Sequence, residues 1–146
     1  MASIEMSPAE WNVMRVIWTK SQADTTTIIQ ALQAKRDWSQ STIKTLLRRL
    51  VEKQALTTTK VGRQFMYHPE ISEQHAMQKS ANTLFDSLCD MKKGAILTNL
   101  LESSPLSRSD IERMQKVLAE KAQTAPEQVA CNCLADNCEC EKEVQA

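Results

Sequence analysis

The chain has 146 residues, with 18 basic and 18 acidic side chains, so its formal net charge is zero. This length predicts one or two small domains and leaves no room for a large catalytic scaffold. The sequence has neither an apolar run of about 18 residues nor a charged-then-apolar leader, so we expect no membrane span and no export. We therefore expect a cytoplasmic protein that is not an enzyme.

The zero net charge conceals an uneven distribution. Residues 1–70 carry ten bases and six acids, a net charge of +4, whereas residues 71–146 carry eight bases and twelve acids, a net charge of −4. The stretch 35–63 alone has a net charge of +6. Such asymmetry between two halves indicates a nucleic-acid partner for the basic half.

Two short helices are expected first. Ser7 and the glutamate three residues later can form a capping box, so the first helix begins at Pro8 and ends near Lys20. Either Asp24 or Thr25 can cap a second helix, which closes at the basic pair 35–36.

A third helix is expected over residues 39–53, with Ser39 as its N-cap. Its apolar face comprises Ile43, Leu46, Leu47 and Leu50. The other face is polar and basic, and its short side chains allow close approach to a major groove. Gln40 can pair with adenine, and Lys44 or Arg48 can contact guanine or phosphate. The alternative is an exposed helix whose bases are only solvated.

The pattern then changes to strands. Residues 56–61 are rich in β-branched side chains, a short Gly62-Arg63 turn follows, and residues 64–68 form a second strand that ends at Pro69. Three helices followed by a hairpin predict a winged helix-turn-helix. This pattern favours DNA binding over an exposed helix whose basic side chains are only solvated. The predicted DNA contacts are Ser39, Gln40, Ser41, Thr42, Lys44, Thr45, Arg48, Arg49, Lys60 and Arg63; Lys53 is expected at a phosphate as well.

Residues 72–122 are expected to be helical, with breaks at Gly94 and at 103–105 and with Ser107 or Ser109 capping the last helix. Their leucine-rich stripes favour packing against a second copy of the chain. The predicted fold is mainly α (α+β), with a winged-helix DNA-binding domain at 1–71, a helical dimerisation domain at 72–123 and a cysteine-rich tail at 124–146.

Four of the five cysteines lie within ten residues of the tail, as Cys131, Cys133, Cys138 and Cys140. Thiolates this close suit a soft metal, either Zn(II) on four sulfurs or Cu(I) with bridging sulfurs. The alternative, a pair of disulfides, is disfavoured in the reducing cytosol. Cys89 lies on an apolar stripe and is expected to be a small buried hydrophobic residue rather than a ligand.

The chain resembles the penicillinase-repressor (BlaI/MecI) family over roughly residues 5–122. The residues that carry this resemblance are 7–11, Trp38, Ser39, 42–51, Gly62, Arg63, Tyr67 and Pro69. The cysteine tail departs from the β-lactam-responsive members and is similar to that of the copper-responsive, CopY-type repressors.

The resemblance implies a homodimer on a palindromic double-stranded operator, with Zn(II) on the four tail cysteines, and release of the operator when Cu(I) replaces Zn(II). A copper donor protein is a candidate further partner. Two other functions stay open, a β-lactam-type repressor switched by proteolysis and a thiol metal buffer without a role on DNA.

Overall fold

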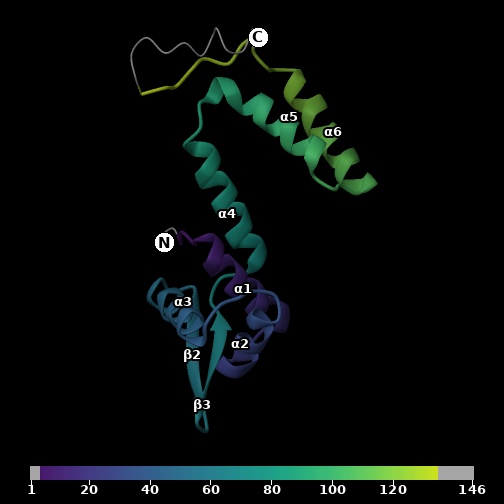
Figure 1. Cartoon of the computed structure of the whole chain (residues 1–146). Helices are drawn as coiled ribbons and strands as arrows, with labels where there is room; N and C mark the ends of the chain where they lie inside the picture. The colour runs from purple at the N-terminus through teal and green to yellow at the C-terminus, as the bar shows by residue number, and fades with distance from the viewer. Residues whose placement is uncertain (1–3, 135–146) are drawn as a thin grey trace. The chain divides into compact units, whose positions relative to one another are not determined.

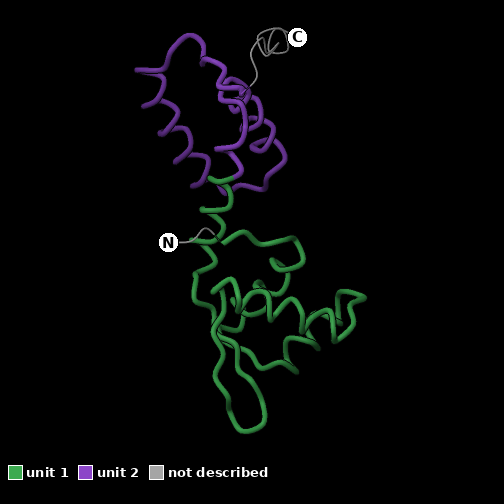
Figure 2. The backbone as a smooth tube through the Cα atoms, turned by 90° about the vertical axis from the view of Figure 1, so that its left-hand side faces the viewer, with its two compact units in different colours: residues 1–83 green, residues 84–146 purple. Residues whose placement is uncertain are grey.

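The computed structural model describes residues 4–134, which divide into two compact units at 83/84 (Figure 2). The first unit contains three helices, a small sheet and most of a fourth helix, and the second contains the remaining helices. The predicted limits of independently folding domains, at 71 and 123, stay a prediction. Within the described range, every helix is too short or too polar to cross a bilayer.

The first three helices begin where the sequence predicts. Helix α1 (Pro8–Lys20) starts with a reciprocal capping box between Ser7 and Glu10. Helix α2 (Thr25–Gln33) is capped by Asp24, which accepts a hydrogen bond from the Thr27 amide at 2.7 Å. That bond lowers the pKa of the Asp24 carboxyl.

Helix α3 (Gln40–Glu52) is capped by Ser39, whose Oγ accepts from the Thr42 amide at 3.2 Å. After it come strands β2 (Leu56–Val61) and β3 (Gln64–Pro69), an antiparallel hairpin that projects beyond the helices (Figure 1). Gly62 in its two-residue loop has φ +65°, a positive value at the first loop position as in a type II′ turn. We call this hairpin the wing.

The sheet has a third strand that the sequence does not predict. Strand β1 (Ala23–Asp24) pairs antiparallel with β3, so the sheet order is β1-β3-β2. Its two residues pair with Met66 and Tyr67 and link the start of α2 to the wing.

The apolar core lies entirely in the first unit. It joins the buried faces of α1, α2 and α3 to the start of β2, through Val13, Met14, Ile17, Ala23, Ile28, Ile29, Leu32, Ile43, Leu46, Leu47, Leu50, Ala55 and Leu56. The indole of Trp18 donates to the Ile71 carbonyl at 2.8 Å, so the end of the wing is also attached to α1. The apolar face of helix α3 therefore packs against this core, while its polar face stays exposed.

The C-terminal helices are α4 (Glu73–Asp86), the short 3₁₀ helix η1 (Asp90–Lys92), α5 (Lys93–Ser103) and α6 (Arg108–Ala122). The break predicted at 103–105 is confirmed, and Ser107 caps α6 in a capping box with Asp110. The break predicted at Gly94 is wrong, because α5 runs through that residue and the chain turns at 87–92 instead.

The predicted fold class is confirmed. The described chain is mostly helical with one small sheet, it contains a winged helix, and cysteines cluster toward its C-terminus.

Candidate nucleic-acid interface and cysteine cluster

Helix α3 exposes the side chains that the sequence predicts at DNA. Gln40, Ser41, Thr42, Lys44, Arg48 and Arg49 are all exposed, and Thr45 is half-buried. Because the buried residues of α3 hold its opposite face in the core, these polar groups lie together on one side of the helix. The set of contacts itself stays a prediction.

The first turn of α3 is ordered by its own hydroxyls. The Ser39 Oγ lies 3.0 Å from the Ser41 Oγ and 2.9 Å from the Thr42 Oγ1. The Thr45 Oγ1 donates to the Ser41 carbonyl at 2.9 Å. Short hydroxyl side chains kept close to the helix leave the backbone accessible to a groove, and they can still hydrogen-bond to DNA.

Three predicted contacts from α3 and the wing line one cleft. Gln40 and Lys44, one helical turn apart, face this cleft of about 780 Å³ together with Arg63 of the wing turn. Thr25 and Thr26 at the start of α2 also line this cleft. The fold thus brings together an amide, an ammonium and a guanidinium from segments some 20 residues apart, which suits contact with a base edge and its phosphates.

The remaining predicted bases lie outside that cleft. Arg48 makes a long ion pair with Glu52, 3.9 Å between Nε and Oε1, and both side chains are largely exposed. Such an exposed pair contributes little to the stability of the fold, and it leaves the guanidinium available to another anion. Lys60 is exposed on β2, and Arg49 is exposed in the last turn of α3.

Lys53, predicted as a further phosphate contact, is held in an ion pair within the fold. Its ammonium lies 2.7 Å from the Glu10 Oε2 and donates to the Glu5 carbonyl, also at 2.7 Å. Glu10 is only 2% exposed. Removing Lys53 from this site would leave a buried carboxylate without its charge partner, so the lysine stabilises the fold; its contact with phosphate stays a prediction.

The ionisation of Glu10 reflects two opposing effects. Burial disfavours its charged form, but the Lys53 ammonium and the Ser7 amide both hydrogen-bond to the carboxylate, with Arg49 adding a favourable charge. The net result is a pKa below the ordinary value for glutamate. The local sequence predicts Glu10 as half of a capping box, but it carries no signal for the burial of this residue or for its lysine partner.

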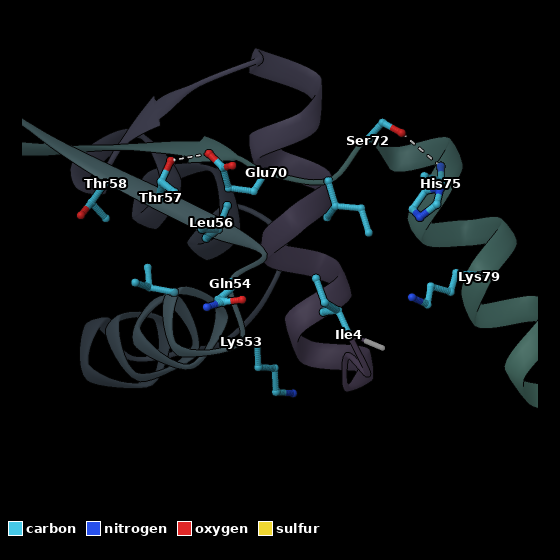
Figure 3. A pocket seen from close by; sticks show the side chains of 12 residues that line it. Ile4, Lys53, Gln54, Leu56, Thr57, Thr58, Glu70, Ser72, His75 and Lys79 are labelled. Carbon is cyan, nitrogen blue, oxygen red and sulfur yellow. Dashed lines mark hydrogen bonds between the residues drawn. The ribbon is translucent and has the colours of Figure 1, made fainter. Parts of the chain in front are cut away.

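A larger cavity of about 920 Å³ lies elsewhere in the first unit, between β2 and the start of α4 (Figure 3). Thr57 donates to Glu70 at 2.8 Å in its wall, and the His75 amide donates to the Ser72 Oγ at 3.2 Å. The first bond links β2 to the residue that follows β3, and the second stabilises the start of α4. None of the ten predicted DNA contacts lines this cavity.

Three cysteines come together in the second unit. The sulfur atoms of Cys89, Cys131 and Cys133 all lie within 4.8 Å of one another. We call these three residues the thiol cluster. Cys138 and Cys140, the other two predicted ligands, lie outside the described residues.

The interpretation of Cys89 as a small buried hydrophobic residue is not what the structure shows. Cys89 is half-buried and its sulfur lies 3.6 Å from that of Cys131. The sequence offers no spacing that links them, because 42 residues separate the two. The helical turn at 87–92 and the return of the chain after α6 are what bring them together.

The chain is similar in sequence to known repressors over most of its length. The family model described as penicillinase repressor matches residues 6–120. An uncharacterized 16.5 kDa protein in the ptsI 3′ region of Latilactobacillus sakei is 48% identical over 139 residues, which are 95% of each chain. The penicillinase repressor of Bacillus licheniformis is 34% identical over 116 residues, 80% of this chain and 91% of that one.

A solved structure is similar to about half of the chain. It is the solution structure of the monomeric form of Bacillus licheniformis BlaI in complex with the blaP half-operator. The sequences are 42% identical, the match covers 51% of this chain and 90% of that chain, and the TM-score is 0.46. The family match spans the winged helix and ends before the first tail cysteine, Cys131.

Proposed function

The chain belongs to the penicillinase repressor family of DNA-binding transcriptional repressors, and from that premise we propose that it is a copper-responsive repressor of a copper-homeostasis operon. In this proposal, the Zn(II)-loaded dimer binds a palindromic operator. Replacement of Zn(II) by Cu(I) on the tail cysteines then releases the DNA. A repressor acts where the chromosome is, so the proposed compartment is the cytoplasm.

One observation carries the copper part of the proposal: a repressor fold is followed by four closely spaced cysteines, Cys131, Cys133, Cys138 and Cys140. Two of them lie within 4.8 Å of a third sulfur in the described part of the chain. Thiolate sulfur selects soft or borderline metals such as Cu(I) and Zn(II) over Mg(II), Ca(II) or Mn(II). The sulfurs therefore fit the metals proposed, and the tail lies beyond the matched family region.

DNA contact is proposed through the exposed face of α3 and through the wing. The observation that supports this proposal is that Gln40, Lys44 and Arg63 line the same cleft. The bases of this surface add a salt-dependent attraction to phosphates, and the amide and hydroxyls can contact base edges. The side chains proposed to contact DNA are the ten residues predicted from the sequence.

A homodimer is proposed from the apolar faces of α5 and α6. Leu97, Leu101, Val117 and Leu118 are 41–58% exposed, and together with Met114 they line one shallow groove. In residues 84–134 no apolar side chain is buried, so these helices build no core of their own. A second copy would bury both grooves, as a two-fold interface does.

The alternative, a β-lactam-type repressor switched by proteolysis, is compatible with the family match, but such a switch needs no thiols. A metal buffer would use the cysteines but needs no winged helix.

A gel-shift titration separates these functions. The purified protein, loaded with Zn(II), is incubated with the DNA fragment upstream of its own gene, and Cu(I) is added while metals and thiols are counted per chain. We expect a complex that disappears as Cu(I) is bound. A complex indifferent to Cu(I) would support the proteolytic switch, and metal binding without any complex would support a buffer.

A further inference from the structure

The thiol cluster joins two segments that are distant in sequence. Cys89 lies three residues after the end of α4 and forms the N-cap of η1, and its carbonyl accepts from the Lys92 amide at 3.0 Å. Cys131 and Cys133 lie in the irregular segment after α6. All three belong to the second compact unit, so their proximity is a property of that unit alone.

Two neighbouring contacts fix how the segments meet. The sulfur of Cys89 donates to that of Cys131 at 3.6 Å, and the Asp90 amide donates to the Asn132 Oδ1 at 2.8 Å. Consecutive residues of one segment therefore contact consecutive residues of the other. A single chance approach of two sulfurs would not produce this register.

The backbone within the cluster also contacts a sulfur atom. The Cys133 amide donates to the Cys131 Sγ at 3.3 Å, so the backbone between these residues folds back toward the sulfur.

The sulfur separations can be compared with those of a metal site. A tetrahedral Zn(II) site with Zn–S bonds of about 2.3 Å has its sulfurs about 3.8 Å apart. The separation of 3.6 Å between Cys89 and Cys131 is close to that value, and much longer than the ~2.05 Å of a disulfide bond. Cys89 and Cys131 are half-buried and Cys133 is exposed, so the cluster can be reached from solvent.

We propose that Cys89 is a metal ligand, which joins Cys131 and Cys133 in a thiolate site for a soft cation, Zn(II) or Cu(I). This inference rests on metal binding by the tail, which is part of the proposed function, and adds a ligand from outside the tail. It anchors the bound metal to the turn between α4 and α5. Metal binding would then involve the helical part of the second unit as well as the tail.

Differential alkylation of the wild-type protein tests this directly. Reduced protein is treated with iodoacetamide with and without one equivalent of Zn(II), and separately of Cu(I), and the modification of each cysteine is measured by peptide mass spectrometry. We expect the metal to protect Cys89 in parallel with Cys131 and Cys133. Equal modification of Cys89 with and without both metals would overturn the proposal.

A variant gives a second, independent measurement. Cys89→Ser should weaken metal affinity about tenfold or more in competition with a chelator, because loss of a ligand costs at least as much as loss of an outer-shell partner. Ser87→Ala, a change of similar size two residues away, should leave the affinity unchanged. Wild-type affinity in a Cys89→Ser protein with an unchanged melting temperature would overturn the proposal.

The two proposals can fail separately. If the wild-type protein protects Cys89 on binding metal but its DNA complex ignores Cu(I), the copper-sensing function fails and the ligand assignment stands. If Cu(I) releases the DNA while Cys89 stays fully reactive, the function stands and the ligand assignment fails.

Discussion

The Lys53 ammonium lies 2.7 Å from the Glu10 carboxylate, so a charge pair with a buried carboxylate joins the end of α3 to the first turn of α1. The same carboxylate oxygen accepts from the Ser7 amide at 2.9 Å and closes the capping box. One side chain thus stabilises the start of α1 and fixes the helix whose exposed face is predicted to contact DNA.

Glu10→Gln should destabilise the fold at neutral pH by roughly 1–3 kcal/mol, since it removes a buried charge partner from the half-exposed Lys53. The folded-state pKa of Glu10 is below the ordinary 4.5 of a glutamate, so its contribution to stability is present above that ordinary value and is lost as the pH falls through the folded-state pKa. Urea unfolding of both proteins at pH 7 and at pH 3 measures the difference.

The control for the Glu10–Lys53 pair is Lys53→Met, which removes the positive charge of the pair. Both single variants should lose stability at pH 7, and the Glu10→Gln/Lys53→Met double variant should lose less than the sum of the two. Strict additivity would contradict a direct interaction.

Gln40→Ala and Arg63→Ala should weaken DNA binding in different ways. Loss of a base-pairing amide should cost about 1–3 kcal/mol on the specific fragment and little on random DNA. Loss of a phosphate contact should weaken both to a similar extent and reduce the slope of log affinity against log salt by about 1. Fluorescence anisotropy over a range of salt concentrations separates the two effects.

Lys20→Ala is the matched control for the basic residues, because Lys20 is exposed at the end of α1 and does not line the cleft of Gln40 and Arg63. Its affinity and salt slope should match the wild type. An equal loss from Lys20→Ala and Arg63→Ala would show a diffuse charge effect rather than an interface.

Ser39 separates capping from DNA contact. Ser39→Ala removes the acceptor for the Thr42 amide and should cost about 1 kcal/mol of stability. Ser39→Asp keeps the cap and should retain the melting temperature, while its negative charge weakens DNA binding through repulsion from phosphate. Tight DNA binding by Ser39→Asp would place this residue away from the interface.

Val117→Glu should convert the proposed dimer to a monomer, since it places a charge in the apolar groove between α5 and α6. Sedimentation equilibrium should give a mass near 16.5 kDa for the variant and twice that for the wild type. Val129→Glu is the control, because Val129 is 49% exposed outside both helices. A dimeric Val117→Glu protein would place the interface elsewhere.

The helices of the winged helix were predictable because their signals are local. Ser7, Asp24 and Ser39 each cap a helix within three residues of their own position, and periodic apolar residues define the buried faces. The wing was predictable for the same reason, from β-branched residues on either side of Gly62.

What the sequence missed depends on long-range contacts. Strand β1 has two residues and no period, and it exists only because β3 pairs with it across the fold. Burial of Glu10 requires Lys53, 43 residues away, and Cys89 meets Cys131 only through the turn at 87–92. Gly94 was expected to break a helix, but near the start of α5 a glycine costs only about 1 kcal/mol.

The central claim, that copper acts through the tail cysteines to release DNA, is tested by one titration. Cu(I) is added to the Zn(II)-loaded protein on a labelled fragment of its own promoter, beside a variant with Cys131, Cys133, Cys138 and Cys140 all changed to Ser. The account predicts that anisotropy falls to that of free DNA for the wild type and stays high for the variant. Release of both proteins by Cu(I), or of neither, would contradict it.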